Sequence, residues 1–153
     1  MSAGRPRALR AASAVVGVYL GLFWGWAGIA KAWAPVAPYE FAARVVGGGW
    51  PAKSVVVVSV VAETLLGLAL LVRAVDPRRG VAASLALLVA FSALLGVAKS
   101  AGGGALACGC YALFATSAAS VDRELWINGV HAAILAALLV AACALERRER
   151  TAT

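Results

Sequence analysis

Four long runs of apolar residues alternate with short stretches that carry most of the charged side chains. The runs cover about residues 11–30, 52–72, 80–97 and 125–145. A bilayer core about 30 Å thick needs roughly 20 apolar helical residues to cross it. Each run therefore predicts a transmembrane helix. The fold class expected for residues 1–153 is a single all-α transmembrane domain, an integral membrane four-helix bundle.

The composition supports a membrane protein over a soluble one. Of the 153 residues 63% are hydrophobic and only 14% are charged, and the mean hydropathy is +0.89. A soluble domain averages about 45–50% apolar and about 25% charged residues. The chain has too few polar side chains to cover a water-exposed surface of its size.

The first apolar run has two interpretations, a retained helix or a cleaved signal peptide. Three arginines precede it: Arg5, Arg7 and Arg10. The run is longer than the roughly 7–15 apolar residues of a signal peptide, which favours retention. It also carries three glycines at GxxxG spacing: Gly17, Gly21 and Gly25. Such spacing suits close packing of helices, although glycine is also an ordinary residue of membrane helices.

The basic residues predict the orientation. With four spans, the N-terminus, the second loop and the C-terminus share one side, and nine of the 14 lysines and arginines fall there. The positive-inside rule then predicts a protein of the cell inner (plasma) membrane with both termini on the cytoplasmic side. The net charge of +7 indicates topology and attraction to the lipid bilayer. It does not indicate nucleic-acid binding, because no soluble basic domain or aromatic reader motif accompanies it.

The first loop predicts a short interfacial helix between the first and second spans. After Pro38, apolar side chains recur at helical spacing from Tyr39 to Val46, and the glycines 47–49 then end any helix. Trp33, Tyr39 and Trp50 are the expected anchors in the outer interface.

The sharpest chemical feature is Cys108-Gly-Cys110 in the third loop, on the predicted outer face. Disulfides persist outside the cytoplasm, and strained or exposed ones tend to be catalytic or labile. The pair could therefore exchange electrons with a thiol of another protein, or form a static disulfide. Cys143, near the opposite end of the fourth span, is too distant to pair with them in a monomer and is interpreted as a small buried apolar residue. Two cysteines and a distant His131 do not make a four-ligand zinc site unless the site is shared between chains, so no metal is expected.

Glu63 lies about eleven residues into the second span, near mid-bilayer. An ionisable group there costs at least about 2.5–3.5 kcal/mol and should face the bundle interior. Lys31, at the outer end of the first span, is the candidate partner, although its depth matches poorly. A proton relay, a contact to a ligand headgroup and a packing role all remain open for Glu63.

Four further side chains lie close to the cysteine loop. His131 could move protons or bind a quinone near Trp126, or serve as a packing residue. Asn128 could join two helices by a hydrogen bond. Lys99 could favour a thiolate or extend to the interface.

Together these features resemble the MauE branch of the MauE/DoxX membrane-protein family, over about residues 17–145. The resemblance is carried in order by Gly28-Ile-Ala-Lys31, Pro38, Phe41, Trp50-Pro51, Glu63-Thr-Leu-Leu-Gly67, Phe91, Cys108-Gly-Cys110 and Asn128. Tyr111 and Ala112 stand where the family has Phe-Gly, and Ile127 stands where it has arginine. The resemblance implies a role in methylamine utilisation, in which MauE is thought to form disulfides in, or mature, a methylamine dehydrogenase subunit.

The resulting hypothesis is a membrane thiol–disulfide redox protein. Cys108 and Cys110 would exchange disulfides with an extracytoplasmic thiol protein, and a membrane quinone is the candidate cofactor. The polar side chains that would support this site are Lys31, Glu63, Lys99 and Asn128. The rival is a non-enzymatic scaffold or assembly subunit with a static CxC disulfide. A small-solute transporter has only Glu63 in its favour, and the sequence leaves oligomer formation open.

Overall fold

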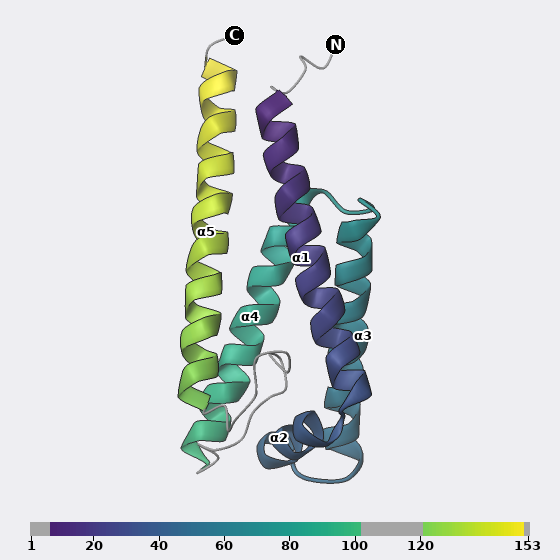
Figure 1. Ribbon diagram of the computed structural model, residues 1–153. Helices are drawn as coiled ribbons and strands as arrows, with labels where there is room; N and C mark the ends of the chain where they lie inside the picture. Colours follow the sequence, from purple (N-terminus) through teal and green to yellow (C-terminus); the bar gives the residue numbers. More distant parts are fainter. Residues whose placement is uncertain (1–6, 102–120, 152–153) are drawn as a thin grey trace.

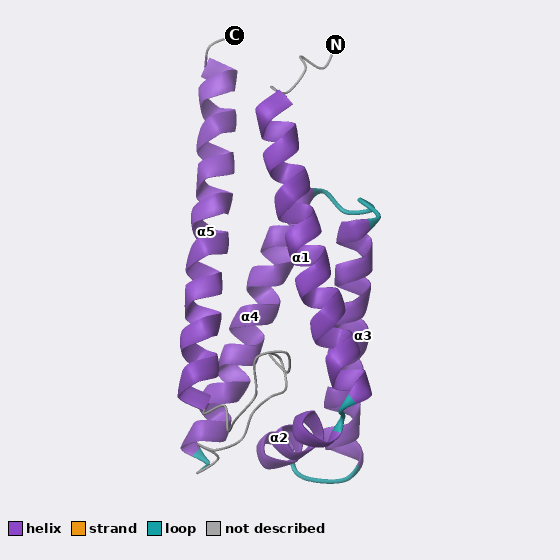
Figure 2. Cartoon of the chain, viewed as in Figure 1, coloured by secondary structure: helices purple, strands orange, loops and turns teal. Residues whose placement is uncertain are grey.

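The computed structural model describes residues 7–101 and 121–151, and all regular structure in these ranges is helical (Figures 1 and 2). The helices are α1 (Arg7–Trp33), α2 (Val36–Val46), α3 (Trp50–Leu71), α4 (Pro77–Ser100) and α5 (Val121–Thr151). Four of them contain segments long and apolar enough to cross a membrane: Ser13–Trp33, Trp50–Leu71, Arg78–Ser100 and Asp122–Ala141. The prediction of an all-α bundle with four membrane-spanning helices is confirmed.

The helices extend beyond the apolar runs that predicted them. α4 begins at Pro77, three residues before the predicted start, because Asp76 caps it. The Asp76 carboxylate accepts a hydrogen bond of 2.9 Å from the Arg78 backbone N–H, and proline suits the first position of a helix. α5 continues through the charged segment after the fourth apolar run as far as Thr151. Apolar periodicity alone could not detect either extension.

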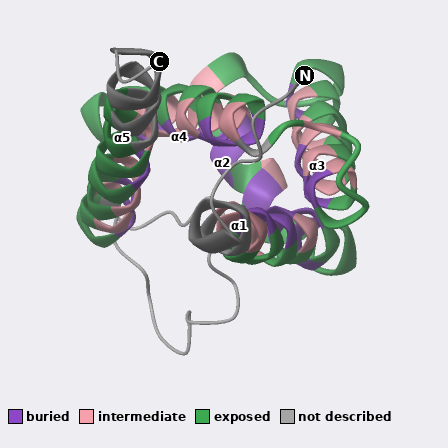
Figure 3. Cartoon of the chain, turned by 90° about the horizontal axis from the view of Figure 1, so that it is seen from above, coloured by how far each residue is buried: buried purple, intermediate pink, exposed green. Residues whose placement is uncertain are grey.

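The four long helices run antiparallel in sequence order. Both ends of the chain lie at one end of the bundle together with the α3–α4 turn, and α2 lies at the opposite end (Figure 1). Seen along the bundle, α1, α3, α4 and α5 stand at the corners of a four-sided arrangement (Figure 3). The predicted sharing of one side by the termini and the second loop is therefore confirmed.

Glycines bring α1 and α3 into close contact. A methyl group at Gly67 of α3 would overlap the backbone nitrogen of Gly25 and lie 2.7 Å from its Cα. A methyl at Gly28 would overlap the Thr64 hydroxyl. At Gly17, by contrast, a methyl would meet nothing within 4 Å. The predicted close packing of the first span holds around Gly25, but Gly17 takes no part in it.

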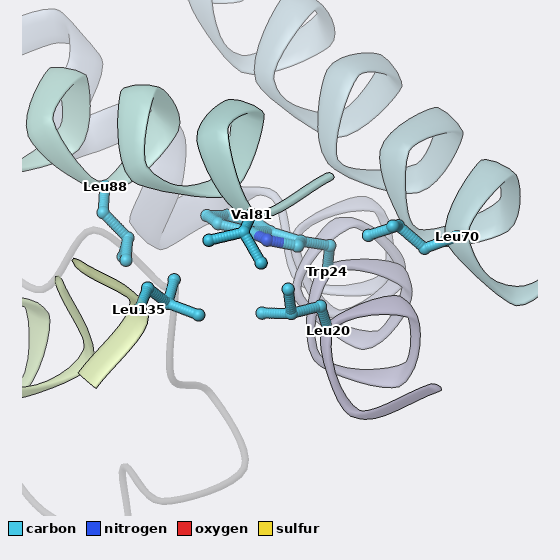
Figure 4. Close-up of a cluster of buried hydrophobic side chains, with 6 residues drawn as sticks. All are labelled: Leu20, Trp24, Leu70, Val81, Leu88 and Leu135. Atoms are coloured by element: carbon cyan, nitrogen blue, oxygen red, sulfur yellow. The ribbon is translucent and has the colours of Figure 1, made fainter. Parts of the chain in front are cut away.

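The apolar core draws on all four long helices. Its buried members surround Trp24: Leu20, Leu70, Val81, Leu88 and Leu135 (Figure 4). The indole N–H of Trp24 donates a 2.8 Å hydrogen bond to the hydroxyl of Ser84, and both residues are buried. This bond joins α1 to α4 inside the core.

Replacing Ser84 with alanine should lower the free energy of unfolding by about 1–3 kcal/mol, because the buried indole N–H of Trp24 loses its acceptor. The measurement is reversible unfolding in detergent micelles. The additional change Trp24→Phe removes the orphaned donor, so it should cost less in the Ser84→Ala background than alone. Equal costs in both backgrounds would show that the hydrogen bond contributes nothing.

α2 packs against the bundle with its apolar face. Phe41 is buried against Leu95 and Ala98 of α4, and Glu40 and Arg44 are exposed. The predicted amphipathic helix is confirmed, and it starts at Val36, three residues earlier than its apolar pattern indicates. The helix contacts α3 and α4, and its position at the membrane interface stays a prediction.

The connection from α2 to α3 requires glycine. Gly47 and Gly49 have φ of 87° and 78°, in the region that side chains disfavour. The Gly49 backbone N–H donates a 3.1 Å hydrogen bond to the Tyr39 hydroxyl, which ties α2 to the start of α3. Trp33 and Trp50, expected as interfacial anchors, are both highly exposed.

Candidate functional site

A buried ion pair joins α1 to α3. The Lys31 ammonium lies 2.5 and 2.6 Å from the two carboxylate oxygens of Glu63. The exposed fractions of the two side chains are 3% and 0%. Charged groups of this kind are stable inside an apolar bundle only when paired and hydrogen-bonded. The predicted pairing of Lys31 with Glu63 is confirmed.

The register of α1 against α3 explains why the two charges meet. Gly28 packs on Val60 and Thr64, so Lys31, about one turn further along α1, lies beside Glu63. The apparent difference in depth arose from assuming that α1 ends at the membrane surface. In the structure α1 ends alongside α3, near the α2 end of the bundle, and α2 packs against α3 and α4 there (Figure 1).

Phe91 of α4 lies against the ion pair, and the neighbouring Ser92 links α4 to α5. The Lys31 nitrogen lies 5.0 Å from the centre of the Phe91 ring, a favourable cation–π distance. Ser92, the residue after Phe91, accepts a 3.2 Å hydrogen bond from the buried side-chain amide of Asn128. Asn128 thus joins α4 to α5, as one of its interpretations predicted.

Glu124 is a buried carboxylate that the sequence analysis missed. It lies in the first turn of α5, is 2% exposed, and its charge acts on Lys31. The available signal was its spacing: Glu124 lies one helical turn before Asn128, on the same face. The sequence analysis gave no role to the residues just before the fourth apolar run.

His131 forms a second polar contact, between α5 and α1, about one turn further along α5 than Asn128. Its Nδ1 lies 3.1 Å from the Ile127 carbonyl oxygen, which can only accept, so Nδ1 carries the proton. Nε2 is then the acceptor for the Tyr19 hydroxyl at 2.9 Å. The ring also lies 5.2 Å from that of Phe23. Tyr19 was not anticipated, because a tyrosine in an apolar run has no distinctive spacing.

The structure does not bring Trp126 and His131 together. Trp126 is 70% exposed, whereas His131 turns towards α1. A quinone carbonyl needs a hydrogen-bond donor, and the Nε2 atom of His131 is an acceptor in this arrangement. The proposed chemistry below therefore uses no quinone, and quinone binding stays a prediction from the sequence.

The two ends of the third loop are linked by an exposed ion pair. Lys99 in the last turn of α4 lies 2.5 Å from the carboxylate of Asp122 in the first turn of α5. Cys108 and Cys110, predicted as the reactive pair, lie outside the described residues. Cys143 lies in α5, and its side chain is likewise outside the described part.

The described residues form no metal-binding cluster. Within 7–101 and 121–151, no three His, Cys, Asp or Glu side chains gather as metal ligands. Among the described residues, the buried ionisable groups at the α2 end of the bundle are Lys31, Glu63 and Glu124. Their arrangement can hold charge and hydrogen bonds inside the membrane.

Four membrane-length helices around a buried lysine–glutamate pair define a multi-pass membrane protein. Residues 9–142 match the family described as methylamine utilisation protein MauE, and the chain belongs to that family. The MauE resemblance noted from the sequence is thereby confirmed. Comparisons with curated proteins and with solved structures gave no match.

Proposed function

We propose that this MauE-family protein is a membrane thiol–disulfide redox protein that acts on an extracytoplasmic thiol protein in methylamine utilisation. The observation that carries the proposal is where the cysteine-bearing segment begins and ends. α4 ends at Ser100 and α5 begins at Val121, both at the end of the bundle opposite the chain termini (Figure 1). With cytoplasmic termini, as the arginine distribution predicts, Cys108 and Cys110 belong to the oxidising side.

The exchange needs no group beyond the two proteins. A thiolate of the reduced partner attacks one sulfur of the Cys108–Cys110 disulfide, and this S–S bond breaks as a mixed disulfide forms. A second partner thiolate attacks the partner's own sulfur in the mixed disulfide, so that a disulfide forms in the partner and the remaining cysteine is released, which leaves Cys108 and Cys110 as a dithiol. The partner loses two electrons and Cys108 and Cys110 gain them, and two protons pass from the partner's thiols to theirs. The same steps run in reverse when the partner starts oxidised.

The described residues have a supporting role in this proposal. The Lys31–Glu63 pair fixes α1 to α3 beneath α2, and the Lys99–Asp122 pair joins the two ends of the segment that carries the cysteines. Lys99 therefore already has a carboxylate partner. Its effect on a thiolate is correspondingly weaker than that of an unpaired lysine.

The test is the redox state of Cys108 and Cys110 in membranes poised at a series of potentials, read by differential alkylation and mass spectrometry. We expect a reversible couple in the range of exchange proteins, roughly −120 to −270 mV. Cys110→Ser should trap a mixed disulfide with the partner. Cys143→Ser is the matched control and should leave the couple unchanged.

Cysteines that stay in one redox state at every potential would overturn the proposal. A permanent disulfide, with a partner complex that survives the double change Cys108→Ser and Cys110→Ser, would identify a membrane scaffold instead.

A further inference from the structure

A small cavity adjoins the ion pair on the side that α2 covers. Its volume is about 20 Å³, and all of the first four helices line it. Phe41 and Ala42 of α2 form one wall and Phe91 of α4 another. Among the described residues that line it, the polar side chains are Lys31 and Ser59.

We propose that this cavity is a binding site for one water molecule, which hydrates the Lys31–Glu63 pair from the α2 end of the bundle. A single water needs a cavity of roughly 10–15 Å³ and at least two polar partners. The cavity meets both requirements. The inference is independent of the cysteine chemistry proposed above.

The hydrogen-bonding capacity of the two polar residues matches one water. Lys31 has three N–H donors, and Glu63 offers two oxygens at 2.5 and 2.6 Å. The remaining N–H can donate to the water oxygen. The Ser59 hydroxyl donates to the Val56 carbonyl at 2.9 Å, so its oxygen lone pairs are available to accept from the water.

Other occupants fit less well. A chloride ion would add a negative charge beside Glu63 in apolar surroundings, and burying an uncompensated charge is costly. In a dry cavity the buried ammonium would keep its described contacts, the two Glu63 oxygens and the Phe91 ring, and an unmade hydrogen bond to a charged group costs more than a neutral one.

Hydroxyl-radical footprinting by X-ray radiolysis, on the full chain in lipid nanodiscs, tests the site. Radicals formed from a bound water modify the side chains around it, so Phe41 and Phe91 should be labelled. Phe23, which does not line the cavity, serves as the internal reference for an intact bundle and should stay unlabelled.

Two pairs of variants separate a bound water from general exposure. Ala42→Leu fills the cavity and should abolish labelling of Phe41 and Phe91, whereas Ala37→Leu, at an exposed position of the same helix, should not.

Ser59→Ala removes the hydroxyl that accepts a hydrogen bond from the water, and it should reduce labelling of the two phenylalanines. Ser54→Ala is its control, because Ser54 also donates to a carbonyl of its own helix but is exposed.

Absence of label on Phe41 and Phe91 in the unmodified chain would overturn the proposal. So would labelling that Ala42→Leu leaves unchanged. Labelling of Phe23 would show that Ala42→Leu disrupts the bundle. The comparison of Ser59→Ala with Ser54→Ala then becomes the test. Equal labelling of Phe41 and Phe91 in these two variants would also overturn the proposal.

Discussion

Replacing Lys31 with methionine is expected to lower the free energy of unfolding by about 3–5 kcal/mol, the range found when one partner of a buried ion pair is removed. Methionine keeps most of the volume and apolar length of lysine, so the loss comes from the charge and not from a cavity. The buried carboxylate of Glu63 would then lack its ammonium partner. Unfolding in lipid nanodiscs or mixed micelles provides the measurement.

Two controls isolate the buried pair. The double change Lys31→Met and Glu63→Leu removes both charges and should recover much of the stability, because apolar replacement of a whole buried pair is often neutral or better. Lys99→Met breaks the Lys99–Asp122 pair, whose side chains are 53% and 69% exposed, and should cost only about 0–1 kcal/mol. A double variant no more stable than Lys31→Met would show that the charges do not explain the loss.

The length of the apolar runs was sufficient to predict the membrane bundle. A span of roughly 20 apolar residues has few alternatives to a transmembrane helix, and four such runs fix the number of crossings. The helix ends were less predictable because they depend on local polar contacts. Asp76 starts α4 by a side-chain hydrogen bond, which apolar periodicity does not record.

The candidate site was predictable only in part. Glu63 is conspicuous because a charge in an apolar run must face inwards, and Lys31 was the nearest candidate of opposite sign. Their common depth depends on where α1 ends relative to α3. That end is set by α2 packing against α3 and α4, a tertiary contact that no local pattern contains.

Tyr19 and Glu124 were missed for different physical reasons. Tyr19 is identified only by the 2.9 Å hydrogen bond to His131, which joins helices 112 residues apart in sequence. Glu124 stands among other charged residues at the start of α5, where a carboxylate is ordinarily solvated. Its burial follows from the way this turn of α5 faces the bundle, and that depends on packing.

Replacing Gly67 with alanine should destabilise the bundle by about 3 kcal/mol or more, at the upper end of the cost of overpacking. The added methyl would overlap the backbone of Gly25 and lie 2.8 Å from the Gly21 carbonyl oxygen. A side chain could rotate away, but backbone atoms cannot, so α1 and α3 must separate.

The matched control lies at the same contact. A methyl at Gly25 meets nothing within 4 Å, so Gly25→Ala should be neutral or slightly stabilising, since alanine favours helix more than glycine. Equal tolerance of the two substitutions would mean that α1 and α3 are further apart than this packing requires.

The close contact and the ion pair should also be energetically coupled. Gly67 and Glu63 are one turn apart on α3, so a separation of the helices at Gly67 also draws Lys31 away from Glu63. Gly67→Ala should therefore cost less in the Lys31→Met and Glu63→Leu background than in the unmodified chain, as expected for neighbouring sites. If the cost is the same in both backgrounds, the glycine contact and the ion pair stabilise the bundle independently, and the close approach of α1 to α3 is not what holds the charges together.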